Sequence, residues 1–261
     1  VRNTAGALHA AGVRPGDRFA VYKENHFDCL LLAAAGIRIG AVPVMLSGLL
    51  SPDAVRPLLQ RVEPKLLAST QRLLEAKGND GSLLSSFSER TLCLDGGVSN
   101  TIALADLLGG ADPAPAPRGD DELMMLTHTS GTTGIPKLIM YTPAQLQGQM
   151  ARLECRHLPP ITFRRKDTVA MFLPYVHARA FTWIYSVLTL SPAKTLLMSQ
   201  NDPEVVGPLF RQHHPTVIEA LPIDFLEMAK LAQENQGDAF SSVRMFVGNF
   251  DAMRWPTIRT F

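Results

Sequence analysis

The segment Thr127–Lys137, T-H-T-S-G-T-T-G-I-P-K, has the composition of a loop that binds phosphate. Its glycines permit backbone conformations with positive φ, so successive amide groups can converge on an anion. Its hydroxyls add rotatable donors, and its lysine adds a compact positive charge suited to phosphate oxygens. The segment therefore predicts a cradle for a polyphosphate, formed by Thr129, Ser130, Gly131, Thr132, Thr133, Gly134 and Lys137.

Two common phosphate-binding motifs do not fit this loop. The nucleoside-triphosphatase motif has four residues between its glycines and Lys-Ser/Thr directly after the second one. Here two residues separate Gly131 from Gly134, and Lys137 follows three residues later. The dinucleotide fingerprint G-x-G-x-x-G is absent as well. A surface turn rich in Ser, Thr and Gly is the alternative, but the flanking apolar runs and the Pro-Lys exit favour a phosphate site.

The elements that position this loop are two predicted strands, Glu122–Thr127 before it and Leu138–Thr142 after it. Short apolar runs alternate with amphipathic runs along most of the chain, which predicts an α/β fold with a largely parallel sheet covered on both faces. The other predicted strands are Arg18–Tyr22, Ala41–Leu46, Lys65–Ser69, Thr168–Leu173, Lys194–Met198, Thr216–Leu221 and Val243–Val247. The predicted helices are Phe27–Ile39, Asp53–Val62, Pro143–His157, Ala180–Leu190, Glu204–Gln212 and Ile223–Asn235.

The proline-rich segment Asp112–Asp121, DPAPAPRGDD, suggests a division of the chain. Its three alternating prolines favour an extended, solvated backbone. We therefore expect a connector at 112–121 between an N-terminal sub-region, 1–111, and a phosphate-loop sub-region, 122–261. An ordered surface loop within one domain is the alternative that composition leaves open.

Composition excludes several classes of protein. The 25 Lys and Arg residues balance 24 Asp and Glu residues, so the net charge of +1 gives no electrostatic case for binding nucleic acid or an anionic membrane. No apolar run reaches the ~18 residues of a membrane span, and no secretory signal is present, so we expect a cytoplasmic protein. The three cysteines form no CxxC pair, and buried, inert thiols are expected.

The loop T-S-G-T-T-G-I-P-K resembles the signature loop of the adenylate-forming superfamily, which includes acyl-CoA synthetases, aryl-CoA ligases, luciferases and peptide-synthetase adenylation domains. Further segments resemble other parts of this family in the family's order: Gly12–Val21, Gly36–Leu46, Phe172–His177 and Val243–Met253. The resemblance implies layered, parallel-rich sheets flanked by helices, as in the family's large N-terminal domain. Val1 begins within a predicted helix, and the family's later segments do not occur before Phe261. We therefore expect a fragment without the C-terminal lid domain.

The resemblance also implies two half-reactions. A carboxylate attacks the α-phosphorus of ATP to give an acyl-adenylate and pyrophosphate, with Mg²⁺ sharing the phosphate charge. The thiol of coenzyme A or of a carrier-protein pantetheine then takes the acyl group, and the sequence does not separate these two acceptors. The resemblance assigns catalytic roles to Lys137 and His177, an adenine side to Gly248, Asn249 and Phe250, and an acyl pocket to His177, Phe181 and Pro222. For His177 the alternative is a structural histidine at the end of a strand.

Departures from the family pattern leave a second function open. Leu138 replaces the glycine that commonly follows the motif lysine, Tyr141-Thr142 replace a Thr-His pair, and Asn249-Phe250-Asp251 replace G-A-P. A non-catalytic nucleotide-binding or scaffolding remnant of the same fold is therefore the alternative to an acid–thiol ligase.

The acyl side of the sequence narrows the substrate class. Peptide-synthetase adenylation domains carry an aspartate near the position of Pro174 that pairs with an α-ammonium, and Phe172–His177 contains no acid. Because a buried ammonium without a partner is costly, we expect a fatty, aryl or small organic acid. Arg179 either contacts a carboxylate or is solvated. His128 and the pair His213-His214 are interpreted as structural.

Overall fold

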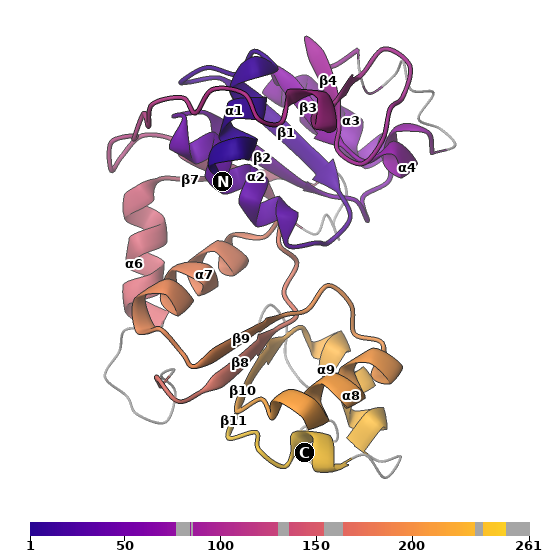
Figure 1. Cartoon of the computed structure of the whole chain (residues 1–261), viewed down its shortest axis with the longest axis vertical. Coiled ribbons are helices and arrows are strands. Elements are labelled where there is room, and N and C mark those ends of the chain that lie inside the picture. Colours follow the sequence, from indigo (N-terminus) through magenta and orange to yellow (C-terminus); the bar gives the residue numbers. More distant parts are fainter. Residues whose placement is uncertain (77–83, 85, 130–135, 154–163, 233–236, 249–261) are drawn as a thin grey trace. The chain divides into compact units, whose positions relative to one another are not determined.

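Two β-sheets organise the chain, and each belongs to its own compact unit (Figure 1). The computed structural model describes residues 1–76, 84, 86–129, 136–153, 164–232 and 237–248. The first unit comprises Val1–Gln147 and Tyr175–Ala178, and the second comprises Gly148–Pro174 and Arg179–Phe261.

A seven-stranded sheet with the order β5-β4-β3-β1-β2-β6-β7 forms the first unit. All of its neighbouring strands are parallel except β6 and β7, which are antiparallel. Its strands are β1 (Arg18–Lys23), β2 (Val42–Ser47), β3 (Leu66–Ser69), β4 (Arg90–Cys93), β5 (Ile102–Ala103), β6 (Met125–His128) and β7 (Leu138–Tyr141). Its helices are α1 (Arg2–Ala10), α2 (Asp28–Arg38), α3 (Pro52–Val62), α4 (Gln71–Leu74) and the 3₁₀-helix η1 (Leu104–Leu107), and α6 (Pro143–Leu153) crosses into the second unit.

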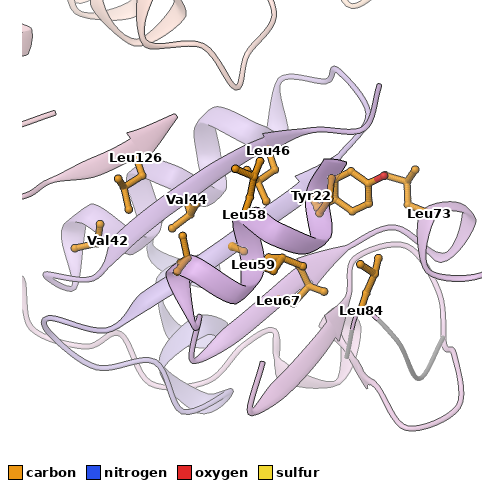
Figure 2. Packing of buried hydrophobic residues seen from close by; sticks show 13 residues of the cluster. Tyr22, Val42, Val44, Leu46, Leu58, Leu59, Leu67, Leu73, Leu84 and Leu126 are labelled. Atoms are coloured by element: carbon orange, nitrogen blue, oxygen red, sulfur yellow. The ribbon is translucent and has the colours of Figure 1, made fainter. Parts of the chain in front are cut away.

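Helices cover both faces of this sheet because its central strand is apolar on both sides. Figure 2 shows the face on which leucines of α3, including Leu58 and Leu59, pack against Tyr22, Val44 and other residues of β1 to β3. Ser51 caps α3, since its hydroxyl accepts a hydrogen bond from the Ala54 N–H at 3.3 Å.

On the opposite face, α2 crosses β1 so closely that a side chain would not fit at Gly36. A Cβ atom built there would lie 2.1 Å from Cε1 of Phe19. The glycine therefore permits the helix to approach the strand, and the two helices α2 and α3 enclose β1 from opposite sides.

A four-stranded parallel sheet with the order β11-β10-β8-β9 forms the second unit. Its elements are β8 (Thr168–Met171), α7 (Ala178–Leu190), β9 (Lys194–Leu197), α8 (Pro203–His213), β10 (Val217–Ala220), α9 (Pro222–Leu231), η3 (Gly237–Phe240) and β11 (Met245–Gly248). Phe172, Phe210 and Phe225 belong to an apolar core that joins α8 and α9 to one face of the sheet. At the amino ends of the strands, the buried carboxylate of Asp167 accepts a hydrogen bond from the Thr216 hydroxyl and pairs with Arg244.

The predicted α/β class and the parallel-rich sheets are confirmed, and the predicted strands and helices coincide with observed elements to within a few residues. The predicted ends of two helices, at His157 and Asn235, lie outside the described residues. The sequence did not predict β4 and β5, which are short and are joined by no helix.

The two units divide at a different place from the sub-regions expected from the sequence. Residues 112–121 lie within the first unit. The Arg38 side chain pairs with Asp112 at 2.9 Å, and the Arg38 carbonyl accepts a hydrogen bond from the Ala116 N–H at 2.9 Å. These contacts hold residues 112–121 to α2 within the first unit. The boundary falls at Gln147–Gly148, because β6 pairs with β2 and so joins the residues after the loop to the first sheet.

No helix in the described part of the chain is both long and apolar enough to cross a membrane. Cys29 and Cys93 are buried and unbridged, and burial raises the pKa of the Cys29 thiol to about 11. Cys29 is therefore protonated and inert at neutral pH, as expected. The third cysteine, Cys155, lies outside the described residues.

Candidate functional site

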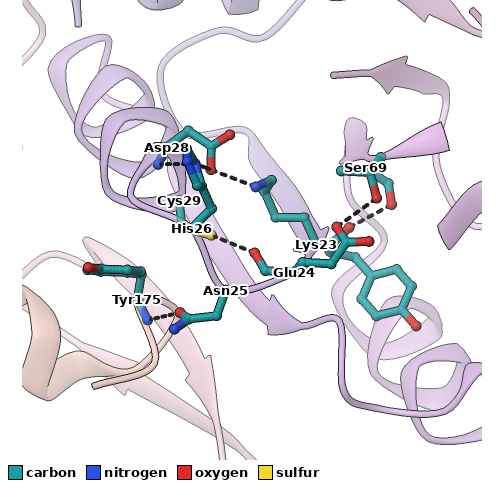
Figure 3. Close-up of polar contacts among 10 residues, drawn as sticks. Lys23, Glu24, Asn25, His26, Asp28, Cys29, Ser69 and Tyr175 are labelled. Carbon is teal, nitrogen blue, oxygen red and sulfur yellow. Dashed lines mark hydrogen bonds and ion pairs between the residues drawn. The ribbon is translucent and has the colours of Figure 1, made fainter. Parts of the chain in front are cut away.

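Polar residues gather at the carboxyl edge of the seven-stranded sheet, the edge at which its parallel strands end. Lys23 ends β1, Ser47 ends β2, Ser69 ends β3 and His128 ends β6. The four strands are parallel neighbours, so these residues share one edge. Figure 3 shows part of this edge. Open α/β sheets bind their ligands outside the carboxyl edge, which makes this edge the candidate site.

The two arms of the predicted phosphate loop meet at this edge. The Thr129 N–H donates to the carbonyl of Lys137, and the Lys137 N–H donates to the Thr129 hydroxyl, each at 3.0 Å. Thr129 Oγ1 accepts in this pair and therefore keeps its own O–H to donate elsewhere. The Lys137 residue is exposed, while Pro136 before it is buried. The loop thus closes at its base and leaves a cation accessible, an arrangement that fits an anionic ligand.

The remaining predicted phosphate-binding residues are not among those the structure describes. They are Ser130, Gly131, Thr132, Thr133 and Gly134. Their assignment stays a prediction that rests on the sequence and on the geometry of Thr129 and Lys137.

His128 fixes the start of the loop. Its Nε2 accepts from the Ser47 N–H at 3.0 Å, and its Nδ1 lies 2.7 Å from the Thr129 carbonyl, so Nδ1 carries the hydrogen of a neutral ring. Burial lowers the pKa of His128, and the contact with the Thr129 carbonyl opposes that shift only in part. The interpretation of His128 as structural agrees with this geometry, which also ties the end of β2 to the loop.

His177 lies in the first unit, in the short segment Tyr175–Ala178. Burial lowers its pKa to about 4, and the nearby His128 ring adds to this effect. His177 is therefore neutral at pH 7. A neutral imidazole presents one donor and one acceptor, which suits polar contacts rather than charge pairing.

The other predicted acyl-pocket and adenine-side residues belong to the second unit. Phe181 is buried on α7, and Pro222 is the first residue of α9, directly after β10. Gly248 ends β11, whose partner β10 aligns Ala220 with it. Pro222 and Gly248 thus share the carboxyl edge of the second sheet. Asn249 and Phe250 lie outside the described residues, and the pocket that groups His177 with Phe181 and Pro222 stays a prediction.

Arg179 contacts a carboxylate of the protein itself. Its Nε and Nη2 donate to the two carboxylate oxygens of Glu219 at 2.6 and 2.8 Å. Glu219 is 0% exposed and the Arg179 side chain 10% exposed, so this bidentate pair is buried. Because the pair is buried, the solvated alternative for Arg179 is wrong. Its partner Glu219 lies on β10, 40 positions away in the sequence.

Asn25 was not among the residues predicted for the site. Its side-chain oxygen Oδ1 accepts from the Tyr175 N–H at 2.7 Å (Figure 3). The available signal was an amide residue placed two positions after a strand that ends at the carboxyl edge. The partner, 150 residues later, gives no local pattern.

The chain is similar to known proteins along nearly its whole length. A family model described as "AMP-binding enzyme" matches residues 1–259. The chain is 35% identical to the 3-amino-2-hydroxy-4-methoxybenzoate diazotase of Streptomyces cremeus over 98% of the chain and 49% of that protein. It is 26% identical to a long-chain-fatty-acid–CoA ligase of Thermus thermophilus over 94% of the chain and 45% of that ligase. The chain therefore spans about half the length of these curated relatives.

Solved structures show the same fold. The N-terminal domain of FACL13 from Mycobacterium tuberculosis superposes with a TM-score of 0.80 at 22% identity, covering 99% of this chain and 63% of that one. ATP-bound MatB from Rhodopseudomonas palustris gives 0.79 at 22% identity, with 99% of this chain and 49% of that one covered.

Proposed function

The chain belongs to the AMP-binding enzyme family and is acyl-CoA ligase-like, and from this premise we propose that it activates a carboxylic acid with ATP. The proposed product is an acyl-adenylate, whose acyl group passes to the thiol of coenzyme A or of a carrier-protein pantetheine. The observation that carries this proposal is the closed loop base at Thr129 and Lys137, which leaves a lysine accessible at the carboxyl edge.

The donor set at this edge fits the phosphates of ATP. Lys137 supplies a positive charge, Thr129 supplies a hydroxyl, and Ser130–Gly134 would add backbone and side-chain donors. When bound, ATP supplies an electrophilic phosphorus and a pyrophosphate leaving group. The residues of this chain hold that leaving group and neutralise its charge, which is a positioning and electrostatic role.

A magnesium ion would be held largely by the phosphates of ATP. In the part of the chain that the structure describes, no group of three or more His, Cys, Asp or Glu side chains is placed to hold a metal ion. Mg²⁺ commonly keeps several waters and binds through substrate phosphates with one or two carboxylates.

The charges of the second unit support an acid without an α-ammonium. The buried acids described there are Asp167, Glu219 and Asp224. Each has internal partners: Arg244 and Thr216 for Asp167, Arg179 for Glu219, and Asn201 for Asp224. Asp167 lies at the amino ends of the strands, and an amino acid that entered near Glu219 or Asp224 would have to displace a protein contact in order to pair its ammonium. A fatty or aryl acid would avoid that cost and gain about 25 cal/mol for each Å² of apolar surface buried.

A second candidate follows from the 35% identity with the diazotase, which exceeds the 26% identity with the fatty-acid ligase. In this candidate the substrate is an aminobenzoate, and the product is its diazonium ion. The balanced reaction is ArNH₂ + HNO₂ + ATP + H⁺ → ArN₂⁺ + AMP + PPi + H₂O, with nitrite as the source of the second nitrogen and pyrophosphate as the leaving group of ATP. Nitrite, like a carboxylate, offers a nucleophilic oxygen that could attack ATP at the same phosphate site.

One experiment separates these functions from each other and from a non-catalytic remnant. The complete gene product receives ATP, Mg²⁺ and a panel of acids, and pyrophosphate release is measured with hydroxylamine present to trap acyl-adenylates as hydroxamates. Thioester formation is then measured with coenzyme A. A parallel set receives aminobenzoates with nitrite at neutral pH, and diazonium product is detected by azo coupling.

Hydroxamate from an acid without an α-amine, followed by thioester, supports the ligase. Azo dye that depends on ATP, without hydroxamate, supports the diazotase. Nucleotide binding with no pyrophosphate from any mixture supports the remnant and contradicts both enzymes. Preference for an α-amino acid over its des-amino analogue would overturn the substrate class.

A further inference from the structure

The segment Tyr175–Ala178 is held in the first unit although the residues on either side of it, Pro174 and Arg179, belong to the second. The strand β8 and the helix α7 that flank it are also parts of the second unit. Its place in the first unit therefore depends on contacts with residues distant in the sequence.

Two contacts come from one turn, the connection between β1 and α2. Asn25 accepts a hydrogen bond from the backbone N–H of Tyr175 at 2.7 Å (Figure 3). The Phe27 ring meets the Tyr175 ring edge to face, with centroids 6.4 Å apart and planes at 85°. Tyr175 is 0% exposed, so loss of the Asn25 acceptor would leave a buried N–H short of that partner, which is unfavourable.

The turn that carries Asn25 is itself fixed by its neighbours. Lys23 pairs with Asp28 at 2.6 Å, across the turn. The Glu24 carboxylate accepts from the Thr70 hydroxyl at 2.8 Å and pairs with Arg72 at 2.5 Å. Because the residues before and after Asn25 are anchored, its side-chain oxygen is presented in one place.

His177 lies two residues beyond Tyr175 in the same segment. It belongs to the same unit as His128, the residue before Thr129 at the start of the phosphate loop, and the two rings are close enough to interact electrostatically. A shift of Tyr175 would carry His177 away from that place, since only Val176 separates them.

We propose that Asn25 is a positioning residue: its hydrogen bond to the Tyr175 backbone holds His177 at the carboxyl edge beside the phosphate loop. The importance of this for catalysis rests on the proposed function, in which His177 borders the acid and the thiol. The placement of His177 itself can be tested without turnover.

The first test is a histidine NMR titration of the complete protein labelled with ¹³C at histidine, with His177 assigned from His177→Gln. In the parent protein, the chemical shift of His177 should be that of a neutral imidazole at every pH above 5. In Asn25→Ala the segment is released to solvent, and His177 should titrate near the ordinary histidine pKa of about 6.5. The matched control is Gln71→Ala, which removes another side-chain amide of the first unit, one that contacts Glu75. It should leave the His177 signal unchanged.

The second test is kinetic. Asn25→Ala should raise the KM for the acid about tenfold and change the KM for ATP less than twofold, because a small displacement of a positioned group is costly. Asn25→Asp retains the accepting oxygen and should keep the KM for the acid within about threefold of the parent. A purely structural role would instead lower the Tm and affect all kinetic parameters alike.

The proposal would be overturned if the His177 chemical shift in Asn25→Ala did not change with pH above pH 5. It would also be overturned if Asn25→Ala left the KM for the acid unchanged while His177→Gln raised it. If the parent turns over none of the acids, the proposed function fails, and the titration alone still decides whether Asn25 positions His177.

Discussion

The phosphate loop of the first sheet and the interior of the second sheet use ionisable side chains in opposite ways. At the carboxyl edge of the first sheet, the two histidines are neutral, the backbone groups of Ser47 and Thr129 hold His128, and Lys137 is exposed. In the second sheet, two buried carboxylates are held in ion pairs, Glu219 with Arg179 and Asp167 with Arg244.

The groups at the loop of the first sheet therefore position a ligand site, whereas the ion pairs of the second sheet affect the stability of the fold. Neutral, hydrogen-bonded groups fix a loop without competing for an anion, so the exposed cation stays available to a ligand. In a buried ion pair each charge depends on the other for its stability. Removal of one partner leaves the other charge unpaired in a low-dielectric interior and lowers the free energy of unfolding. Four predictions follow from this contrast and are ordered by the size of the expected effect.

The largest effect is expected at the buried pair of the second unit. Glu219→Ala leaves the Arg179 guanidinium without its carboxylate and should lower the free energy of unfolding by about 3–5 kcal/mol. Denaturant unfolding measures this loss. The double variant Arg179→Met with Glu219→Met removes both charges and should lie within about 1 kcal/mol of the parent. A double variant as unstable as Glu219→Ala would contradict this account.

Lys137→Ala should affect the chemistry and leave the fold intact. Removal of a positioned charge from a phosphate site is expected to reduce the adenylation rate about 10²-fold, which corresponds to about 2.7 kcal/mol in the barrier. The free energy of unfolding should change by less than about 0.5 kcal/mol, because the residue is exposed. ATP–pyrophosphate exchange with the acid substrate measures the rate, and unchanged exchange would refute the assignment of the loop.

His177 should make the stability of the protein depend on pH. The unfolded chain binds a proton at this residue near pH 6.5, whereas the folded chain binds it near its pKa of about 4. The contribution is therefore complete above pH 6.5 and is lost as the pH falls from 6.5 towards 4, by on the order of 2 kcal/mol at pH 5. Unfolding in denaturant at a series of pH values should show a smaller loss for His177→Gln than for the parent, and equal losses would argue against burial of the imidazole.

The smallest effect is expected at an exposed ion pair of the first unit. Lys65 and Glu89 lie 2.5 Å apart, with 35% and 65% of their side chains exposed. Lys65→Met should change the free energy of unfolding by less than about 0.5 kcal/mol, because solvent and salt screen the pair. If Lys65→Met lowered the free energy of unfolding by more than about 2 kcal/mol in the same denaturant assay, the proposed difference between exposed and buried ion pairs would be wrong.

Local patterns in the sequence determined much of this molecule. The apolar runs around Phe19, Val44 and Ile218 predicted strands, because buried strands of parallel sheets are continuously apolar. The amphipathic run Asp53–Val62 predicted α3, and the composition of Thr127–Lys137 predicted a loop whose arms the structure joins. Each of these patterns lies within about ten consecutive residues, so it can be recognised without knowledge of the fold.

Tertiary structure alone decided the features that depend on residues distant in the sequence. The unit boundary follows from the pairing of β6 with β2. The short strand β4 forms on the edge of β3, and β5 forms on the edge of β4. The partner of Arg179 lies 40 residues away, and the partner of Asn25 lies 150 residues away. Such contacts have no periodicity or fixed spacing to reveal them, because the path of the chain through the whole fold sets which side chains meet.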